Sequence, residues 1–453
     1  MTRIAAEMQK LKRLALSEGG LKARVLRSIA LVFAGDGSQG LIQLASNLIL
    51  TRILAPDIFG LMALATVLLT GMQLFTDIGV STTVVRSRRS EDEIFLRTAW
   101  TLQAVRGVVI ALIAMAAAPF VADFYEQPEL ELLLTVISLS VIFRSCGTIE
   151  IAMRSRQLTL GRLAVMQVGV ALVTAVVTIS AAWWLRSVWA LAVGQLTAAA
   201  LLMVVSYPLL GARILRPALE RAAMREIFTF GRWVLLATVL TFLGLQGLRA
   251  VQGALVPLEV LGFIAIAAAL ANAAEAILGQ INGRVAFPAF SEIVRDRPDE
   301  LPRVLRRVRL ISFALATPPL LFLSFTGQFA VDLLYDPRYA AAGGFLSLLA
   351  INSIVLLSSH SYQATQLALG ASHLHALAMG VLAAGCIAGS VIGYQLGGAM
   401  GMIAGVFPGC VLQAVATHWL AARRGVATPD IDLVMLAVVT VAYGGQLSLL
   451  GVI

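Results

Sequence analysis

Charged residues interrupt several long apolar segments of this sequence, and they mark places where chemistry can occur. Asp36, Asp77, Arg106, Glu275 and His360 each lie inside a run of mainly apolar residues. Because a charged side chain at the centre of a bilayer costs roughly 3 kcal/mol or more, such residues face other helices or water-filled cavities. We expect the three carboxylates and the imidazole, which titrates near neutral pH, to act in coupling or gating. The alternative is a structural role, in ion pairs or hydrogen bonds that hold helices together.

A second set of residues can bind a polar ligand. Arg52 and Arg249 lie near the ends of two apolar runs, and the guanidinium fork suits phosphate oxygens. Asn47 and Gln246 add hydrogen-bonding groups to the same two runs, and Arg106 adds a third cation. We expect these five side chains to bind the substrate. The alternative for Arg52 and Arg249 is that they extend to the lipid headgroups.

Composition identifies the elements that must position these residues. The 453 residues are 59% hydrophobic and 13% charged, whereas soluble domains carry about 25% charged residues. Continuous apolar runs of about 20 residues are long enough to cross a bilayer as helices. The formal charge of +9 is dispersed over short loops, which excludes a nucleic-acid-binding protein. The three cysteines form no Cys-x-x-Cys pair, so we expect neither a metal site nor a cofactor.

The apolar runs predict an all-α polytopic membrane protein with about thirteen transmembrane helices. The predicted spans are 28–51, 58–85, 98–121, 131–153, 163–185, 187–210, 230–254, 258–283, 309–329, 343–367, 375–396, 398–420 and 432–452. Most of the 34 Lys and Arg residues lie before the first span or in alternate loops. Since positive residues favour the cytoplasmic side, we expect a cytoplasmic N-terminus and an outer C-terminus.

A weak internal repeat divides the chain. The segment LTRILAPDIFGLMALA (residues 50–65) returns as GALVPLEVLGFIAIA (residues 253–267). Six predicted spans separate the two copies, so both corners face the same side and the halves are parallel repeats around a central cleft. We expect a basic cytoplasmic segment (1–27), an N-lobe of spans 1–6 (28–212), a C-lobe of spans 7–12 (213–422) and an extra C-terminal span (423–453).

Several motifs resemble a known family. The first hairpin, LTRILAPDIFGLMALATVLLTGMQLFTDIGVSTTVVR, is similar to that of bacterial Wzx-like polysaccharide flippases of the multidrug/oligosaccharidyl-lipid/polysaccharide exporter superfamily. The similarity includes the corner residues Arg52, Leu54, Pro56, Phe59 and Gly60 and the turn residues Asp77 and Gly79. VAFPAFSEI (285–293) and LLYDPRYAAAG (333–343) also resemble family segments. The resemblance covers residues 25 to 420, and thirteen spans depart from the twelve or fourteen that members often have.

The resemblance implies a MATE-like alternating-access transporter of the bacterial inner membrane. Its implied cargo is an undecaprenyl-diphosphate-linked oligosaccharide, moved from the cytoplasmic to the outer leaflet for lipopolysaccharide or exopolysaccharide synthesis. Arg52 and Arg249 would then contact the diphosphate. Membrane lipids and the polymerase and glycosyltransferases of the same pathway are the other implied partners.

Three other functions stay open at this point. A multidrug/cation antiporter would need a smaller aromatic cavity with acidic cation sites. A lipid II flippase would carry the peptidoglycan precursor. A membrane polymerase or ligase for O-antigen would need catalytic groups on the outer face, usually in a large outer loop, whereas every predicted outer loop is short. We therefore expect a transporter and not an enzyme.

Overall fold

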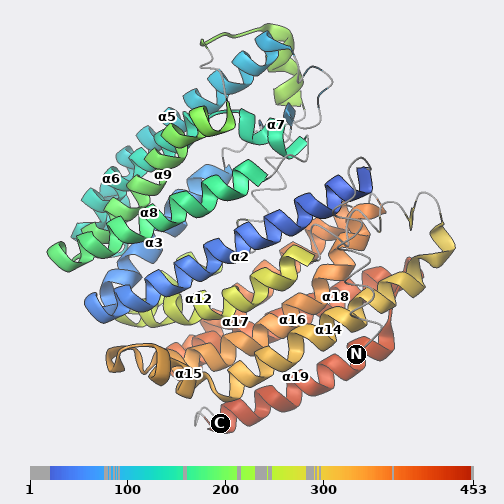
Figure 1. The fold of residues 1–453 in the computed structure, drawn as a ribbon. Helices are drawn as coiled ribbons and strands as arrows, with labels where there is room; N and C mark the ends of the chain where they lie inside the picture. Colours follow the sequence, from blue (N-terminus) through green and yellow to red (C-terminus); the bar gives the residue numbers. More distant parts are fainter. Residues whose placement is uncertain are drawn as a thin grey trace.

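The computed structural model describes residues 21–75, 92–156, 161–211, 216–229, 247–281, 297–369 and 372–449, with single residues and pairs between these ranges. Every regular element within this part of the chain is a helix (Figure 1). Eight of these helices are long and apolar enough to cross a membrane, and two shorter apolar helices accompany them. The prediction of an all-α polytopic membrane protein is therefore confirmed.

Helices from the first half of the chain form one group. They are α2 (Leu21–Ile53), α3 (Pro56–Phe75), α5 (Glu93–Phe124), α6 (Pro128–Ser145), α7 (Glu150–Arg156), α8 (Gly161–Leu185) and α9 (Val188–Leu210). Helices α5 and α6 pack as a hairpin, as do α8 and α9, and α6 packs against α9. Local sequence explains the helix ends: the Asp92 side chain caps α5, and Gly211 ends α9 with the positive φ that glycine adopts readily.

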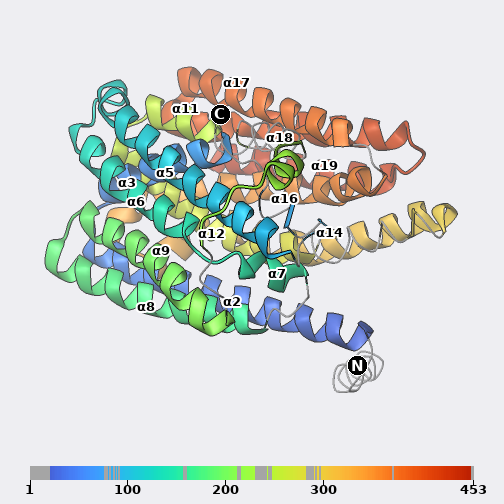
Figure 2. The same ribbon diagram turned by 90° about the horizontal axis from the view of Figure 1, so that it is seen from above.

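Helices from the second half form the other group. They are α11 (Gly247–Leu255), α12 (Leu258–Ile281), α14 (Leu301–Phe325), α15 (Gly327–Leu334), α16 (Ala342–Ala368), α17 (Ser372–Ala404), α18 (Val406–Ala422) and α19 (Pro429–Leu449), with 3-10 turns η2 (Pro298–Glu300) and η3 (Pro337–Tyr339). Helix α16 lies at the centre, packed against α12, α14, α17, α18 and α19. The two groups meet where α3 packs on α12 and where α2 lies against both α8 and α12 (Figures 1 and 2).

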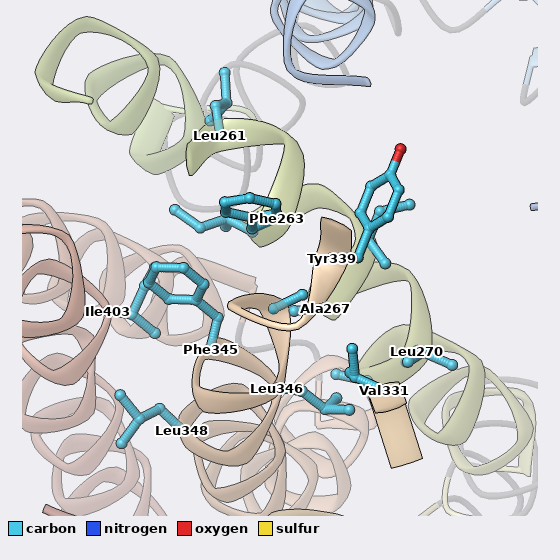
Figure 3. Close-up of a cluster of buried hydrophobic side chains, with 14 of the residues drawn as sticks. Leu261, Phe263, Ala267, Leu270, Val331, Tyr339, Phe345, Leu346, Leu348 and Ile403 are labelled. Carbon is cyan, nitrogen blue, oxygen red and sulfur yellow. The ribbon is translucent and has the colours of Figure 1, made fainter. Parts of the chain in front are cut away.

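The largest buried apolar cluster lies next to this contact. It joins α12 to α15, η3, α16 and α17, and Figure 3 shows Phe263 and Ala267 of α12 facing Phe345 and Leu346 of α16. Leu44 and Leu48 of α2 and Phe59 of α3 pack against the same cluster. Burial of large apolar side chains, each worth about 1.5–3 kcal/mol, therefore stabilises the junction between the groups.

The boundary predicted between residues 396 and 398 is correct. Gly397 and Gly398 have non-helical backbone angles, and the chain reverses there. The segments before and after this turn pack with almost no space between their backbones. A Cβ on Gly389 would lie 2.0 Å from the Gly405 carbonyl oxygen. Small residues allow this close approach of membrane helices.

Two predicted spans differ from the structure. The span predicted at 131–153 is broken, because α6 ends at Ser145 and the Thr148 hydroxyl accepts the Glu150 backbone N–H that begins α7. The span predicted at 309–329 begins earlier, at Leu301, and a second helix, α15, begins at Gly327. Arg309, the first residue of that predicted span, is buried inside α14.

Residues 216–229, which begin the predicted C-lobe, are bonded to the start of α5. The Ala218 backbone N–H donates to the Thr101 hydroxyl (3.0 Å), and the Glu220 N–H donates to the Thr98 hydroxyl (3.1 Å). The Glu220 carboxylate also pairs with Arg89 at 2.7 Å. This part of the connection between the two halves is therefore held by the first helix group.

Candidate functional site

Helix α2 has two exposed faces of opposite character. Leu41 and Ile49 are 69% and 45% exposed, and exposed Ala45 lies between them at the same spacing of four residues. Gln39, Gln43 and Asn47 follow a second spacing of four; Gln43 is exposed and the other two are half-buried. With 3.6 residues per turn, the centres of the two stripes lie about 160° apart. The apolar stripe suits contact with lipid, and the polar stripe suits a water-filled space.

The neighbours of α2 locate the polar stripe. Gly35 brings α2 close to α8, since a Cβ there would lie 2.7 Å from that of Ala164. Leu44 and Leu48 pack on the cluster around α12. On a helical wheel, the polar stripe and the apolar stripe fall on opposite sides of α2, each between the side that faces α8 and the side that faces α12. Neither of these two neighbours therefore covers the polar stripe.

Arg52 lies beyond this stripe, at the end of α2, with an exposed side chain. Its backbone carbonyl accepts a hydrogen bond from Nη2 of Arg338 (3.0 Å). Hydrogen bonds from Arg338 lower the pKa of Asp336, and the charge of Arg52 lowers it further. Arg52 is thus placed in a surface group of charges, about 8 Å along the helix from Asn47.

The other predicted cations lie on different helices. Arg249 is exposed on α11, which packs on α17 and α3. Arg106 is half-buried on α5, and its Nη2 donates to the Gln73 carbonyl on α3 at 2.9 Å. Because Arg106 follows Glu93 by thirteen residues, it lies about 20 Å along α5, near the middle of the helix.

The predicted coupling residues are only partly visible. His360 is half-buried on α16, about 27 Å along the helix from Ala342 and thus far from the Arg52 end. Asp36 lies on α2 and Glu275 on α12, but their side chains fall outside the described residues, as do Asp77 and Gln246 entirely. Within the described part of the chain, no group of three or more His, Cys, Asp or Glu side chains could hold a metal ion.

Sequence reasoning missed a buried polar cluster around Asp432, in the first turn of α19. Arg309 of α14 donates from Nη2 to Oδ1 (2.5 Å) and from Nη1 to Oδ2 (3.1 Å). Tyr362 of α16 donates to Oδ2 at 2.6 Å, and Nδ1 of His418 on α18 lies 2.6 Å from the same oxygen. Arg309 also donates to the Thr428 hydroxyl. Four helices are joined through one carboxylate.

This cluster has a recognisable signal in the sequence. Asp432 stands at the start of an apolar run, three residues after Pro429, the first residue of α19. A carboxylate there needs a cation from another helix. Arg309 is 3% exposed, and its guanidinium lies over the Tyr362 ring, 3.9 Å from the centroid. What could not be read from the sequence is which arginine provides the cation.

Comparison with known proteins identifies the fold and the family. A model of the family described as "Polysaccharide biosynthesis protein" matches residues 49–342. The chain is 23% identical over 319 residues to the lipopolysaccharide biosynthesis protein WzxC of Escherichia coli (strain K12), a match that covers 69% of this chain and 63% of that protein. The chain thus spans less than two thirds of the length of this curated relative.

Solved structures of transporters share the fold. The lipid II flippase MurJ in an inward closed conformation superposes with a TM-score of 0.73 at 8% identity, covering 92% of this chain and 98% of that chain. An inward-facing multidrug resistance MATE family transporter of the MOP superfamily gives 0.67 at 12% identity, covering 85% and 94%. At these identities the likeness establishes the fold alone, which is the MATE-like fold expected.

Proposed function

Because the chain belongs to the polysaccharide biosynthesis protein family, we propose that it is a flippase for an undecaprenyl-diphosphate-linked oligosaccharide. It carries the repeat unit from the cytoplasmic to the outer leaflet of a bacterial inner membrane by alternating access, as one step in the synthesis of a surface polysaccharide. The polymerase and glycosyltransferases of the pathway act after and before it. This multi-pass membrane protein is a transporter and not an enzyme.

The observation that carries the proposal is that α2 exposes a polar face and an apolar face on opposite sides. A lipid-linked oligosaccharide has a polar head and a long apolar tail, so its carrier needs a polar lining beside a surface open to lipid. Gln39, Gln43 and Asn47 line one side of α2, and Leu41 and Ile49 line the other. Amide side chains both donate and accept hydrogen bonds, which suits sugar hydroxyls.

The remaining residues take roles consistent with this lining. Arg106, Arg52 and Arg249 supply the positive charge that a diphosphate requires. Asn47 and Gln246 hydrogen-bond the sugars. Protonation or cation binding at the carboxylates and imidazole of four further residues drives the cycle: Asp36, Asp77, Glu275 and His360. The location of Arg52 in a surface group of charges supports an encounter with the phosphates at the outer mouth of the path.

The organisation proposed is two parallel six-helix lobes (28–212 and 213–422) that rock about the cleft between them, with a basic N-terminal segment (1–27) and an extra last span (423–453). The positive residues of alternate loops favour a cytoplasmic N-terminus. Packing of α3 on α12 and of α2 on both α8 and α12 supplies the contact about which such lobes move.

A deletion strain tests the function. It should lose one surface polysaccharide and accumulate the lipid-linked repeat unit on the cytoplasmic leaflet. In a complemented strain, Gln43→Leu should lower export about fivefold, the value of one lost hydrogen bond of roughly 1 kcal/mol. Ala45→Leu, on the lipid-facing stripe, is the matched control and should export normally. Normal export from Gln43→Leu together with loss from Ala45→Leu would contradict the proposed path.

A lipid II flippase is the second candidate, favoured by the TM-score of 0.73 to MurJ. The two cargoes share the lipid diphosphate but differ in the attached group. Expression of this chain in cells depleted of their own lipid II flippase separates the candidates. Restored growth would favour lipid II, whereas a lost surface polysaccharide in the deletion strain with normal cell-wall synthesis favours the oligosaccharide.

A further inference from the structure

The two copies of the internal repeat touch each other reciprocally. A Cβ on Gly60 would lie 2.0 Å from the carbonyl oxygen of Leu258, and a Cβ on Gly262 would lie 1.9 Å from the carbonyl oxygen of Pro56. Gly60 and Gly262 are equivalent positions of the repeat, and Pro56 and Leu258 are equivalent in the same register. This is the pattern of an isologous contact around a twofold axis. Only glycine permits such an approach of two backbones on both sides.

Tyr339 closes the same contact from the second helix group. Its side chain is fully buried, and its hydroxyl donates to the Leu54 carbonyl at the corner between α2 and α3 (2.9 Å). Its ring meets Phe59 of the first corner edge-on and Phe263 of the second, with centroids 6.0 and 6.2 Å apart. Tyr339 therefore contacts both copies of the repeat at once.

Another bond extends the contact at the same end of the bundle. The Tyr125 hydroxyl, at the end of α5, donates to the Ala250 carbonyl of α11 at 3.2 Å. In Figure 1 this end of the bundle holds the corner between α2 and α3 and the start of α12, and the opposite end holds the starts of α2, α5 and α14. The first and second helix groups are thus joined at the end of the bundle away from the starts of α2, α5 and α14.

We propose that Gly60, Gly262 and Tyr339 form a gate that closes the outer end of the path and must part before cargo leaves. The inference rests on the proposed function for what passes the gate, but not for the gate itself. At its centre this contact is made by backbone atoms and one tyrosine, and the apolar side chains of Phe59 and Phe263 pack around it. A Cβ at either glycine opposes the closed state and has no such effect once the corners are apart. Alanine therefore shifts the protein toward the open state.

Cross-linking across the gate measures its closure without any cargo. Asp57→Cys and Ala341→Cys place exposed thiols just after the first corner and just after Tyr339, in a background lacking Cys146, Cys386 and Cys410. A bifunctional methanethiosulfonate should join them in membranes at high yield. Tyr339→Phe should lower the closed-to-open ratio about fivefold, the effect of one hydrogen bond. Gly60→Ala and Gly262→Ala should reduce cross-linking to background.

Matched controls separate the gate from general damage. Tyr335 is also buried, but its hydroxyl makes no hydrogen bond, so Tyr335→Phe should cross-link like the parent. Gly169→Ala places a methyl group where no atom lies within 4 Å and should also behave like the parent. Undiminished cross-linking in Tyr339→Phe, Gly60→Ala and Gly262→Ala, at normal protein level, would overturn the gate.

A transport readout tests the two proposals separately. Cross-linking the gate should stop export of surface polysaccharide, and a reductant that cleaves the linker should restore it. If the variants change cross-linking as expected but a locked gate still permits export, the gate stands and the proposed flippase cycle fails. If export stops equally in parent cells treated with a monofunctional reagent, the lock is not the cause and the gate proposal fails.

Discussion

Asp432→Asn should destabilise the protein far more than Asp430→Asn, although both aspartates begin α19 and each pairs with an arginine of α14. Arg309 and Asp432 have side chains that are 2% and 13% exposed, whereas those of Arg306 and Asp430 are 55% and 51% exposed. Asparagine at 432 leaves a buried guanidinium without its counter-charge, which costs about 3–5 kcal/mol. The same change at 430 breaks an exposed pair, which solvent screens and which therefore adds little to stability.

Thermal unfolding of each variant in detergent, at matched protein concentration, measures this difference in stability. The double variant Arg309→Met/Asp432→Leu should recover most of the loss, because replacing a buried pair by apolar residues of similar volume is often neutral. A double-mutant cycle then gives the coupling between the two residues. Equal shifts for Asp432→Asn and Asp430→Asn would refute the argument that burial determines the value of these pairs.

Four further predictions follow from other parts of the molecule. Arg249→Ala should lose most export and Arg249→Glu nearly all, while Arg249→Lys keeps part because lysine supplies charge without the bidentate fork; normal export from Arg249→Glu would remove this residue from the phosphate site. A cysteine at exposed Glu129 should react with an impermeant maleimide in intact cells and one at exposed Arg303 should not; the opposite pattern would invert the topology. Gly389→Ala should destabilise by about 1–3 kcal/mol through its clash with the Gly405 carbonyl, and Gly380→Ala, which meets no atom within 4 Å, should be silent in the same thermal assay. Hydrogen bonds from Arg89 lower the pKa of Asp92 below its usual 3.8, so its support of residues 216–229 through Arg89 should be complete above about pH 4 and lost as the pH falls through the lowered pKa; hydrogen exchange of this segment should show that response, and Asp92→Ala should lack it.

The helices could be predicted because bilayer thickness fixes the length of an apolar run. Pro56, Pro128 and Pro429 each stand in the first turn of a helix, where proline has no N–H to satisfy, and they mark those boundaries in the sequence. The break between α6 and α7 was missed because residues 131–153 are apolar enough on average to be taken as one span, although Gly147 and Thr148 separate the two helices. A single capping residue is too weak a signal to mark a helix end inside a mainly apolar segment.

The candidate site was harder to predict than the fold. The spacing of Gln39, Gln43 and Asn47 indicates a shared face of a helix, but only the packing of α2 on α8 and α12 shows that neither neighbour covers that face. The corner glycines were visible as a repeat, yet that the copies meet each other depends on the pairing of helices far apart in sequence. Arg309 stands at the predicted boundary of a span, and nothing near it in the sequence indicates that it is buried, because its partner Asp432 lies 123 residues later. A local sequence pattern does not show which residues far apart in the chain come into contact.

That same separation has a consequence for how the protein is made. Arg309 emerges from the ribosome 123 residues before Asp432, and at 5–20 residues per second its partner follows on the order of ten seconds later. During that interval a guanidinium near the start of α14 has no carboxylate to enter the membrane with, so it stays among the lipid headgroups, within reach of its long side chain. Helix α14 settles to its final depth only when α19 arrives. The insertion of α14 is therefore completed only by α19, whose Asp432 follows Arg309 by 123 residues, and a ribosome that stops before α19 leaves α14 displaced toward the surface.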